Sequence, residues 1–418
     1  MLLVEKRKED VPLIRRNPVD ADTLSKTAVI LEDVRSNGEQ ALVEYAEKFG
    51  DWSPGQQLIW RKDELQEVLA SLPQEDQELL QRCAARVERF AFAQRACLTE
   101  TKVAIPGGFA GQSVAPMEKA GCYAPGGRFP LPSSVLMTAV TARVAGVKEV
   151  WVASPKPTPI TLAAAAVAGA DALLAVGGAQ AIAALAFGAG EVPACDAIVG
   201  PGNRWVTAAK QLVAGHVAID MLAGPSELVI LADDSAEPDV IAADLLAQAE
   251  HDTDALPVLI ATDKSLVASV NQELERQLEI LPTKATASEA LKNGFVVLVD
   301  SLDEGVDLCD RMAPEHLQLM THNASELASQ LQHFGGLFVG SGSAEVLGDY
   351  CAGPNHTLPT GGTARSAGGL CVNHFLRVRT WMEIDSSKES QPLVQDAIAL
   401  ARHEGLEAHA RAAEKRLG

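Results

Sequence analysis

The chain has 418 residues, of which 47% are hydrophobic, and a formal net charge of -20 at pH 7. A chain of this length can form roughly two to four domains with large apolar cores. Its 55 acidic residues outnumber its 35 basic ones, and no cluster of lysine and arginine stands out that could follow a phosphate backbone. This balance argues against nucleic acid and anionic membrane surfaces as partners.

The cysteines and the chain start point to the cytoplasm. Seven cysteines are scattered without a CxxC pair, so neither a disulfide framework nor a thiolate zinc cluster is expected. The start, MLLVEKRKED, carries charges where a signal peptide needs an apolar run. The most apolar region, 160–190, is broken by Asp171 and several glycines, which argues against a membrane span. We therefore expect a soluble cytoplasmic protein.

The first third of the chain is predicted to be mainly helical. Residues 21–49 and 62–96 show amphipathic spacing with charged outer faces. Residues 106–132 are rich in glycine and proline, which predicts a strand followed by a loop that leads into a domain.

From about residue 147 onward, short β-branched runs alternate with longer alanine- and leucine-rich segments. The runs predicted as buried strands are VKEVWVAS, ALLAVGG, DAIVGPGN, ELVILADD, PVLIATD, FVVLVD and GLFVGSG. Their alternation with helices predicts parallel βαβ units and an α/β fold. After Gly369 the alternation stops, leaving LCVNHFLRVRTWMEID and one final helix over 391–417. Such a tail packs either on its own chain or on a neighbouring subunit.

The stretch LLAQAEHD closes a predicted buried helix over 236–248 with polar residues. Gln248 and His251 are three residues apart and share one helical face, with Asp252 just beyond. Such a pair can offer an amide oxygen and an imidazole nitrogen to one metal ion. The alternative is a solvent-facing histidine that the helix dipole favours near the carboxyl end.

The segment APEHLQL places adjacent acid and base groups at a predicted strand start. Pro314 is expected to end a helix, and Glu315 and His316 to enter a short strand. Both side chains can transfer protons. Neighbours on a strand point to opposite faces, so both can serve one site only if the backbone turns there.

The segment GDYCAGPNHTLPTGG is dense in turn-forming residues and contains Asp349 and His356. Ordering such a loop costs backbone entropy, so a geometric task is expected, and the carboxylate of Asp349 could complete a metal site. His356 could equally be a structural hydrogen-bonding residue. The other histidines are assigned surface or packing roles: His216, His322, His333, His374 and His403.

Glycine-rich turns follow three of the predicted strands, in GCYAPGG, VGGAQA and VGPGNRW. Each places flexible backbone where the amino end of a helix can meet an anion. None matches the GxGxxG dinucleotide pattern, because GPGNRW lacks the third glycine. These turns predict a ligand in this region without naming it, and ordinary tight turns remain the alternative.

The motifs, in their order along the chain, resemble those of the histidinol dehydrogenase family. The matching segments are GCYAPGG, PSSVLMTAV, GGAQAIAALAFG, VGPGN, IDMLAGPSE, LLAQAEHD, APEHLQL and GDYCAGPNHTLPTGGTAR. They span nearly the whole chain, and agreement at so many separated motifs is specific.

The resemblance implies two Rossmann-like domains with parallel sheets, an N-terminal arm and an extended C-terminal helical tail. The implied divisions are an arm over 1–18, a first domain over 19–119 and 229–370, an inserted NAD-binding domain over 120–228, and a tail over 371–418. It also implies a homodimer with shared active sites, in which the arm and tail exchange contacts between the subunits.

The resemblance further implies the zinc-dependent oxidation of L-histidinol to L-histidine in two NAD-dependent steps, with one zinc ion per subunit. Glu315 and His316 are the implied catalytic residues, Glu315 activating water and His316 taking the alcohol proton. The implied zinc ligands are Gln248, His251, Asp349 and His409, the last reaching the other subunit's site. The implied substrate-binding residues are Ser226, Gln248, His251, His316, Asp349, Glu404 and His409, and the cofactor contacts are Tyr123, Gln180 and Asn203.

Two segments depart from the family pattern. Where GGTAxYPSS is expected, the chain reads GGRFPLPSS with Arg128, Phe129 and Leu131, and the segment LCVNHFLRVRTWMEID is also unusual. One alternative is therefore a paralogue that oxidises another alcohol, such as a sulfonated diol. A second is a non-catalytic binding protein on the same scaffold, against which the joint presence of the site residues argues. Glu404 and His409 favour histidinol.

Overall fold

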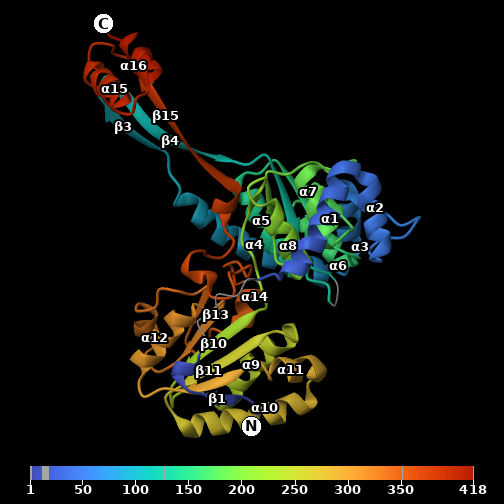
Figure 1. The fold of residues 1–418 in the computed structure, drawn as a ribbon. Helices are drawn as coiled ribbons and strands as arrows, with labels where there is room; N and C mark the ends of the chain where they lie inside the picture. The colour runs from blue at the N-terminus through green and yellow to red at the C-terminus, as the bar shows by residue number, and fades with distance from the viewer. Residues whose placement is uncertain (1, 12–17, 127–128, 351, 418) are drawn as a thin grey trace.

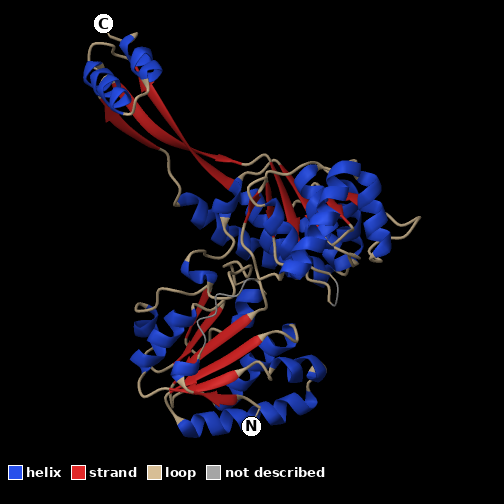
Figure 2. Ribbon diagram, viewed as in Figure 1, coloured by secondary structure: helices blue, strands red, loops and turns tan. Residues whose placement is uncertain are grey.

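The computed structural model describes residues 2–11, 18–126, 129–350 and 352–417. Two six-stranded sheets and one three-stranded sheet organise the chain (Figures 1 and 2). Helices cover both faces of each large sheet, and most strand pairs within these sheets are parallel. The predicted α/β class with two Rossmann-like units is confirmed. Within the described residues, no helix is long and apolar enough to cross a membrane.

The first large sheet has the order β1-β12-β11-β10-β13-β14, and all its pairs are parallel. Its strands are β1 (Val4–Lys6), β10 (Glu227–Ala232), β11 (Leu256–Ala261), β12 (Phe295–Leu298), β13 (His316–Met320) and β14 (Gly336–Val339). Its helices are α9 (Pro238–His251), α10 (Lys264–Ile280), α11 (Lys284–Ala290), α12 (Leu302–Met312), α13 (Ala324–Ala328) and α14 (Glu345–Asp349).

Strand β10 shows why these runs are continuously apolar. Leu228 and Ile230 face a core shared with α9 and α10, whereas Val229 and Leu231 face a second core with α12. A parallel strand covered on both faces must be apolar at every position. Edge strand β14 is an exception to the predicted burial, because its residues are only half-buried.

The second large sheet has the order β2-β7-β6-β5-β8-β9, in which only β2 pairs antiparallel. Its strands are β2 (Ile59–Arg61), β5 (Lys119–Tyr123), β6 (Glu149–Ala153), β7 (Ala172–Leu174), β8 (Ala197–Val199) and β9 (Ala218–Ile219). Its helices are α5 (Pro132–Ala145), α6 (Pro159–Val167), α7 (Gly178–Phe187) and α8 (Arg204–Val213).

The two large sheets share one order of connection. In each, the chain forms a central strand (β10 or β5), adds the next two strands on one side of it, and then returns to add two strands on its other side. The outermost strand of the first side, β1 or β2, comes from earlier in the chain. The direction therefore reverses between β5 and β8 in one sheet and between β10 and β13 in the other. In open sheets of this kind, ligands commonly bind outside the carboxyl ends of the strands at this reversal. The second sheet fits this rule, whereas the first sheet gathers its buried polar side chains at the amino end of β13 instead.

Four amino-terminal helices pack on the second sheet's helices: α1 (Ala21–Asn37), α2 (Glu39–Lys48), α3 (Lys62–Ser71) and α4 (Gln74–Ala96). The prediction placed residues 19–119 in the first domain, and the structure differs. Ile30, Leu31 and Val34 of α1 join the apolar core of α7, which includes Ile182 and Leu185. An amphipathic pattern predicts that a helix buries one face, but not which sheet receives it.

A long arm leaves the second domain and carries the C-terminal helices at its far end (Figure 1). It is an antiparallel sheet of β3 (Thr101–Ile105), β4 (Gly108–Pro116) and β15 (Leu376–Ile384). The predicted single helix over 391–417 is wrong, since α15 (Gln391–His403) and α16 (Glu407–Glu414) are separate. Gly405 between them has a φ of 75°, which a continuing helix cannot accommodate.

The chain start forms the edge of the first sheet. Strand β1 pairs with β12, and the Leu3 side chain is fully buried. The predicted N-terminal arm over 1–18 is described only in part, because residues 1 and 12–17 lie outside the described residues. Short 3-10 helices occur at Lys8–Asp10, Thr363–Arg365 and Val372–Phe375. The six described cysteines are free thiols, and Cys351 lies outside the described residues.

Candidate functional site

Glu315 and His316 lie side by side at the amino end of β13. Helix α12 ends at Met312, and Ala313 adopts a left-handed conformation with a φ of 50°. Glu315 therefore precedes the regular strand, and the alternation of strand side chains does not separate it from His316. Its Oε2 lies 3.7 Å from Nδ1 of His316. The turning backbone required by the sequence argument is present, so both groups can serve one site.

The hydrogen bond of His316 fixes which ring nitrogen can act as a base. Nδ1 lies 2.9 Å from the carbonyl oxygen of Glu227. Because a carbonyl only accepts, Nδ1 carries the proton and Nε2 presents a lone pair. Nε2 is buried, has no hydrogen-bond partner within the described part of the chain, and lies 4.0 Å from Oδ1 of Asp349. Burial lowers the pKa of His316 to about 4, so the ring is neutral at neutral pH.

The carboxyl group of Glu315 is held through one oxygen. Its Oε2 accepts hydrogen bonds from Oγ of Ser226 at 2.6 Å and from the backbone N–H of Glu227 at 2.8 Å. Burial raises the pKa of Glu315 well above its ordinary value, although both hydrogen bonds act in the opposite direction. A carboxyl group with a raised pKa is suited to proton exchange near neutral pH.

Helix α9 brings Gln248 and His251 to the same place. Gln248 is fully buried, and neither Oε1 nor Nε2 has a partner within the described residues. His251 is the last residue of the helix, and its Nε2 lies 3.6 Å from Oδ2 of Asp349. Buried amide groups are normally hydrogen-bonded, so the partnerless Oε1 and Nε2 of Gln248 mark this amide as a candidate ligand-binding group. Asp252 is the C-cap of α9 and is exposed.

The turn-rich sequence around Asp349 predicted a loop, but the structure places Asp349 as the last residue of the short helix α14. His356 contacts it, with Nδ1 at 2.9 Å from the Asp349 carbonyl oxygen and Nε2 at 3.3 Å from Oγ of Ser134. His356 thus links α14 to α5 of the second domain. This geometry matches the structural alternative for His356.

Glu345 was missed by the sequence reasoning. Its side chain is buried, and neither carboxyl oxygen has a hydrogen-bond partner among the described residues. Oε1 lies 3.5 Å from Nδ1 of His316. Ligand atoms of His251, Glu345 and Asp349 all lie within 4.8 Å of one another. Burial, followed by the charges of Asp349 and Glu315, raises the pKa of Glu345 well above its ordinary value. The available signal was its spacing of four from Asp349, which places both on one helical face.

Glu404 and His409 do not join this group within one chain. Glu404 follows α15, and His409 is in α16, at the far end of the arm (Figure 1). Both side chains are exposed. Any contribution of these residues to a site built on α9, β13 and α14 must therefore come from a second subunit.

The three predicted cofactor residues lie at the carboxyl edge of the second sheet. Tyr123 ends β5, and its hydroxyl accepts a hydrogen bond from the Gly178 N–H at 3.1 Å. Gln180 is buried in the first turn of α7. Asn203 caps α8, its Oδ1 accepting from the N–H groups of Trp205 and Val206. Gly127 and Arg128, in the unusual GGRFPLPSS segment, lie outside the described residues.

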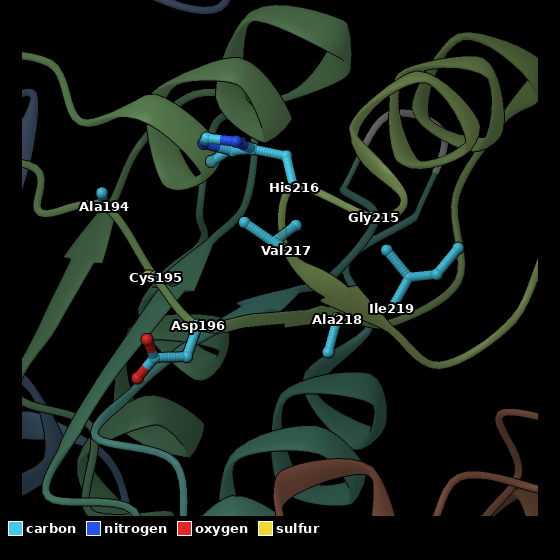
Figure 3. A pocket seen from close by; sticks show the side chains of 9 residues that line it. Ala194, Cys195, Asp196, Gly215, His216, Val217, Ala218 and Ile219 are labelled. Atoms are coloured by element: carbon cyan, nitrogen blue, oxygen red, sulfur yellow. The ribbon is translucent and has the colours of Figure 1, made fainter. Parts of the chain in front are cut away.

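A surface hollow lies elsewhere, beside β8 and the edge strand β9 (Figure 3). Its lining residues are Ala186, Ala194, Cys195, Asp196, Gly215, His216, Val217, Ala218 and Ile219. None of the predicted site residues lines it. The convergence of buried polar groups, rather than the size of a hollow, therefore locates the candidate site at the amino end of β13.

Known proteins resemble this chain along almost its full length. The sequence pattern of the family described as histidinol dehydrogenase matches residues 14–417. Histidinol dehydrogenase of Thermus thermophilus is 47% identical over 391 residues, covering 93% of each chain. That of Aromatoleum aromaticum is 43% identical over 415 residues, covering 98% of this chain and 94% of the other.

The fold gives the same result. The crystal structure of histidinol dehydrogenase from Elizabethkingia anophelis matches with a TM-score of 0.92 and 32% sequence identity, over 100% of this chain and 98% of the other. Agreement in sequence and fold across the whole length makes this protein a dehydrogenase, and the chain belongs to the histidinol dehydrogenase family.

Proposed function

We propose that this protein oxidises L-histidinol to L-histidine, through the aldehyde, in two NAD-dependent steps that require one zinc ion per subunit. The observation that carries the proposal is the group of partnerless buried polar atoms on Gln248 and His316, which converge beside Asp349 and His251. A folded chain leaves such atoms unpaired at a cost of about 1–3 kcal/mol each, which a bound ligand would offset.

The side chains present suit a zinc ion. Gln248 offers an amide oxygen, His251 an imidazole nitrogen and Asp349 a carboxylate oxygen, and His409 of a second subunit would complete the set. Zinc accepts nitrogen and oxygen ligands of these kinds. When bound, it would act as a template that orients the amino and imidazole nitrogens of histidinol. A carboxyl oxygen of Glu345 lies within 4.8 Å of the ligand atoms of His251 and Asp349, so its charge would act on the bound ion from beside these ligands.

His316 is the proposed base in the first oxidation. Its Nε2 lone pair would take the hydroxyl proton of the alcohol while hydride leaves the neighbouring carbon for NAD. The Glu227 carbonyl stabilises the protonated ring by holding the proton on Nδ1. The aldehyde product must then react with water before a second hydride can leave.

Glu315 is the proposed activator of that water. Ser226 and the Glu227 N–H occupy its Oε2, and we propose that Oε1 accepts the proton of the water molecule. The second oxidation yields the carboxylate, so each histidine formed accompanies two NADH. The proposed substrate-binding residues are Ser226, Gln248, His251, His316, Asp349, Glu404 and His409.

The arm supports a homodimer with shared active sites. It carries exposed apolar side chains on β15, including Val378 and Met382, and Leu400 on α15. Surfaces of this kind are commonly covered in an assembly. We propose that the segment from the end of α15 through α16 of one subunit reaches the other subunit's β13 and delivers Glu404 and His409 there.

The direct test incubates the purified protein with zinc, NAD and L-histidinol, and follows NADH absorbance and histidine formation. Two NADH per histidine, with loss of both after chelation and recovery on adding zinc, would support the proposal. The His251→Ala variant should show neither product. Absence of turnover by folded, zinc-loaded protein would contradict histidinol as the substrate and favour another alcohol, for which sulfonated diols are the first probe.

A further inference from the structure

Asp51 lies in the connection between α2 and β2, a segment without a predicted role. The fold brings it to the carboxyl edge of the second sheet, beside the predicted cofactor residues. Its Oδ2 accepts a hydrogen bond from the Gly177 N–H at 3.0 Å and another from Nε2 of Gln180 at 3.3 Å. An acidic side chain from outside the sheet is thus anchored at the start of α7.

These bonds orient the amide of Gln180. A carboxylate only accepts hydrogen bonds, so the Nε2 side of the amide must face Asp51 and Oε1 must point away from it. Oε1 faces Gly178 instead, where an added Cβ would lie 2.8 Å from it. Gly178 has a φ of 67° and its N–H binds the Tyr123 hydroxyl. Asp51 therefore binds Gln180 directly, and it is linked to Tyr123 through the adjacent N–H groups of Gly177 and Gly178.

An independent observation indicates a ligand at this edge. Ser154 follows β6 and is 1% exposed, yet its Oγ has no hydrogen-bond partner within the described residues. The glycine-rich turn after β5 passes directly over it, because a Cβ on Gly126 would lie 3.1 Å from this Oγ. Pro155 contacts both Gly126 and Gly177, so the buried Ser154 hydroxyl lies beneath the same group of turns to which Asp51 is hydrogen-bonded.

The charges at this edge separate two kinds of dinucleotide. In Rossmann-like units an acidic residue near the end of the second strand binds the hydroxyls of the adenosine ribose, whereas a basic residue accommodates a 2′-phosphate. Here the second strand, β6, is followed by Lys156 rather than by an acid. Asp51 supplies the acid from the connection after α2 instead. Burial raises the pKa of Asp51, and the nearby charge of Lys156 acts in the opposite direction.

We propose that the Asp51 carboxylate accepts hydrogen bonds from the adenosine ribose of the cofactor and sets a preference for NAD over its 2′-phosphorylated form. This inference rests on the proposed function only in assuming a dinucleotide on the second sheet. Oδ1 of Asp51 has no described hydrogen-bond partner and is the proposed acceptor. A 2′-phosphate there would meet the carboxylate at short range and be repelled.

The test compares NADH and NADPH binding, by nucleotide fluorescence without any alcohol, in the wild type and in Asp51→Asn. Asparagine keeps the size of the side chain and an oxygen for Gly177. The wild type should bind NADH at least ~10-fold more tightly than NADPH, and the variant should lose most of that difference. With an alcohol that turns over, the KM for NAD should rise ~10-fold while kcat and the KM for the alcohol change less than ~2-fold.

Glu47→Gln is the matched control. Glu47 is exposed on α2, so this change removes one negative charge nearby without affecting the hydrogen bond to Gly177. It should bind both nucleotides as the wild type does. If Asp51→Asn is unstable, Asp51→Glu replaces it, with weakened NADH binding expected. Equal NADH/NADPH ratios in wild type and variant, or no binding of either nucleotide by the wild type, would overturn the inference. Tight, selective NADH binding without histidinol turnover would instead contradict only the proposed substrate.

Discussion

Ser226 donates a hydrogen bond of 2.6 Å from its hydroxyl to Oε2 of Glu315. These residues were predicted to bind substrate and to activate water, respectively, and the structure joins them directly. Together with the Glu227 N–H, the hydroxyl occupies Oε2 and leaves Oε1 without a hydrogen-bond partner among the described residues. Ser226 therefore bears on the second oxidation through the orientation of Glu315, as well as on substrate binding.

Replacing Ser226 by alanine should slow the second oxidation more than the first. Loss of the hydroxyl lets the Glu315 side chain rotate. A hydrogen bond to a charged group contributes about 1.5–3 kcal/mol, which corresponds to roughly 10–100-fold in rate. The aldehyde should accumulate and be trapped by semicarbazide, so that NADH formed exceeds two per histidine. Ser226→Thr, which keeps a hydroxyl, is the control. Equal slowing of both steps would contradict this role.

Replacing Gln248 by leucine should remove the response to zinc without destabilising the metal-free protein. The wild type buries both polar atoms of this amide without a described partner, and an apolar side chain of similar size avoids that cost. Thermal unfolding with chelator should give a Tm at or above that of the wild type. Added zinc should raise the Tm of the wild type but not that of Gln248→Leu.

The matched control for this experiment is Gln66→Leu. Nε2 of Gln66 donates to the Ala166 carbonyl at 3.2 Å, so that amide is partnered. Its loss should lower the Tm and leave the zinc response intact. A zinc-induced rise in Gln248→Leu as large as that of the wild type would exclude Gln248 as a ligand.

Burial of neutral His316 should make the metal-free protein acid-sensitive. The pKa of His316 falls to about 4 in the folded state, from the 6.5 of an exposed histidine. Between these values the unfolded chain binds a proton that the folded chain does not, so stability is lost as pH falls from 6.5 toward 4. The Tm of the chelated wild type should therefore decrease more steeply over this range than that of His316→Gln. His403→Gln, at an exposed histidine, should keep the wild-type slope.

The α/β layers could be predicted because the forces that build them act locally. ELVILADD reads as a buried strand since both faces of β10 meet apolar cores, and Gln248 and His251 fall together through helical spacing alone. The pairing of β15 with β4 could not be predicted in this way. Leu376 of β15 pairs with Pro116 of β4, which lies far earlier in the sequence. No local sequence pattern specifies such a distant partner.

Glu345 and Asp51 show a second limit. No element was predicted over residues 343–347, and the turn-rich segment predicted next to them begins at Gly348, so the short helix that places Glu345 beside Asp349 was missed. Asp51 sits in an irregular connection with no periodic neighbours, and its role depends on packing α1 and α2 against the second sheet. Both residues reach their places through tertiary contacts that amphipathic patterns leave open.

If α16 serves the other subunit, two inactive variants should restore each other. His251→Ala and His409→Ala lose different halves of the proposed zinc site and should each be inactive. A mixed dimer contains one site with both histidines intact, because its His251 and His409 come from different chains. Co-expression and random pairing should therefore give roughly a quarter of the wild-type activity per site.

The control pairs His251→Ala with Asp349→Ala, whose residues lie 3.6 Å apart in one chain. Each site of that mixed dimer carries one lesion, so no activity should return. Differently tagged subunits allow the mixed dimer to be isolated and its histidinol oxidation and zinc content measured together. Recovery in the first pair alone would require exchange of the arm between subunits. Absence of recovery in an isolated, folded mixed dimer would mean that His409 lies outside the site.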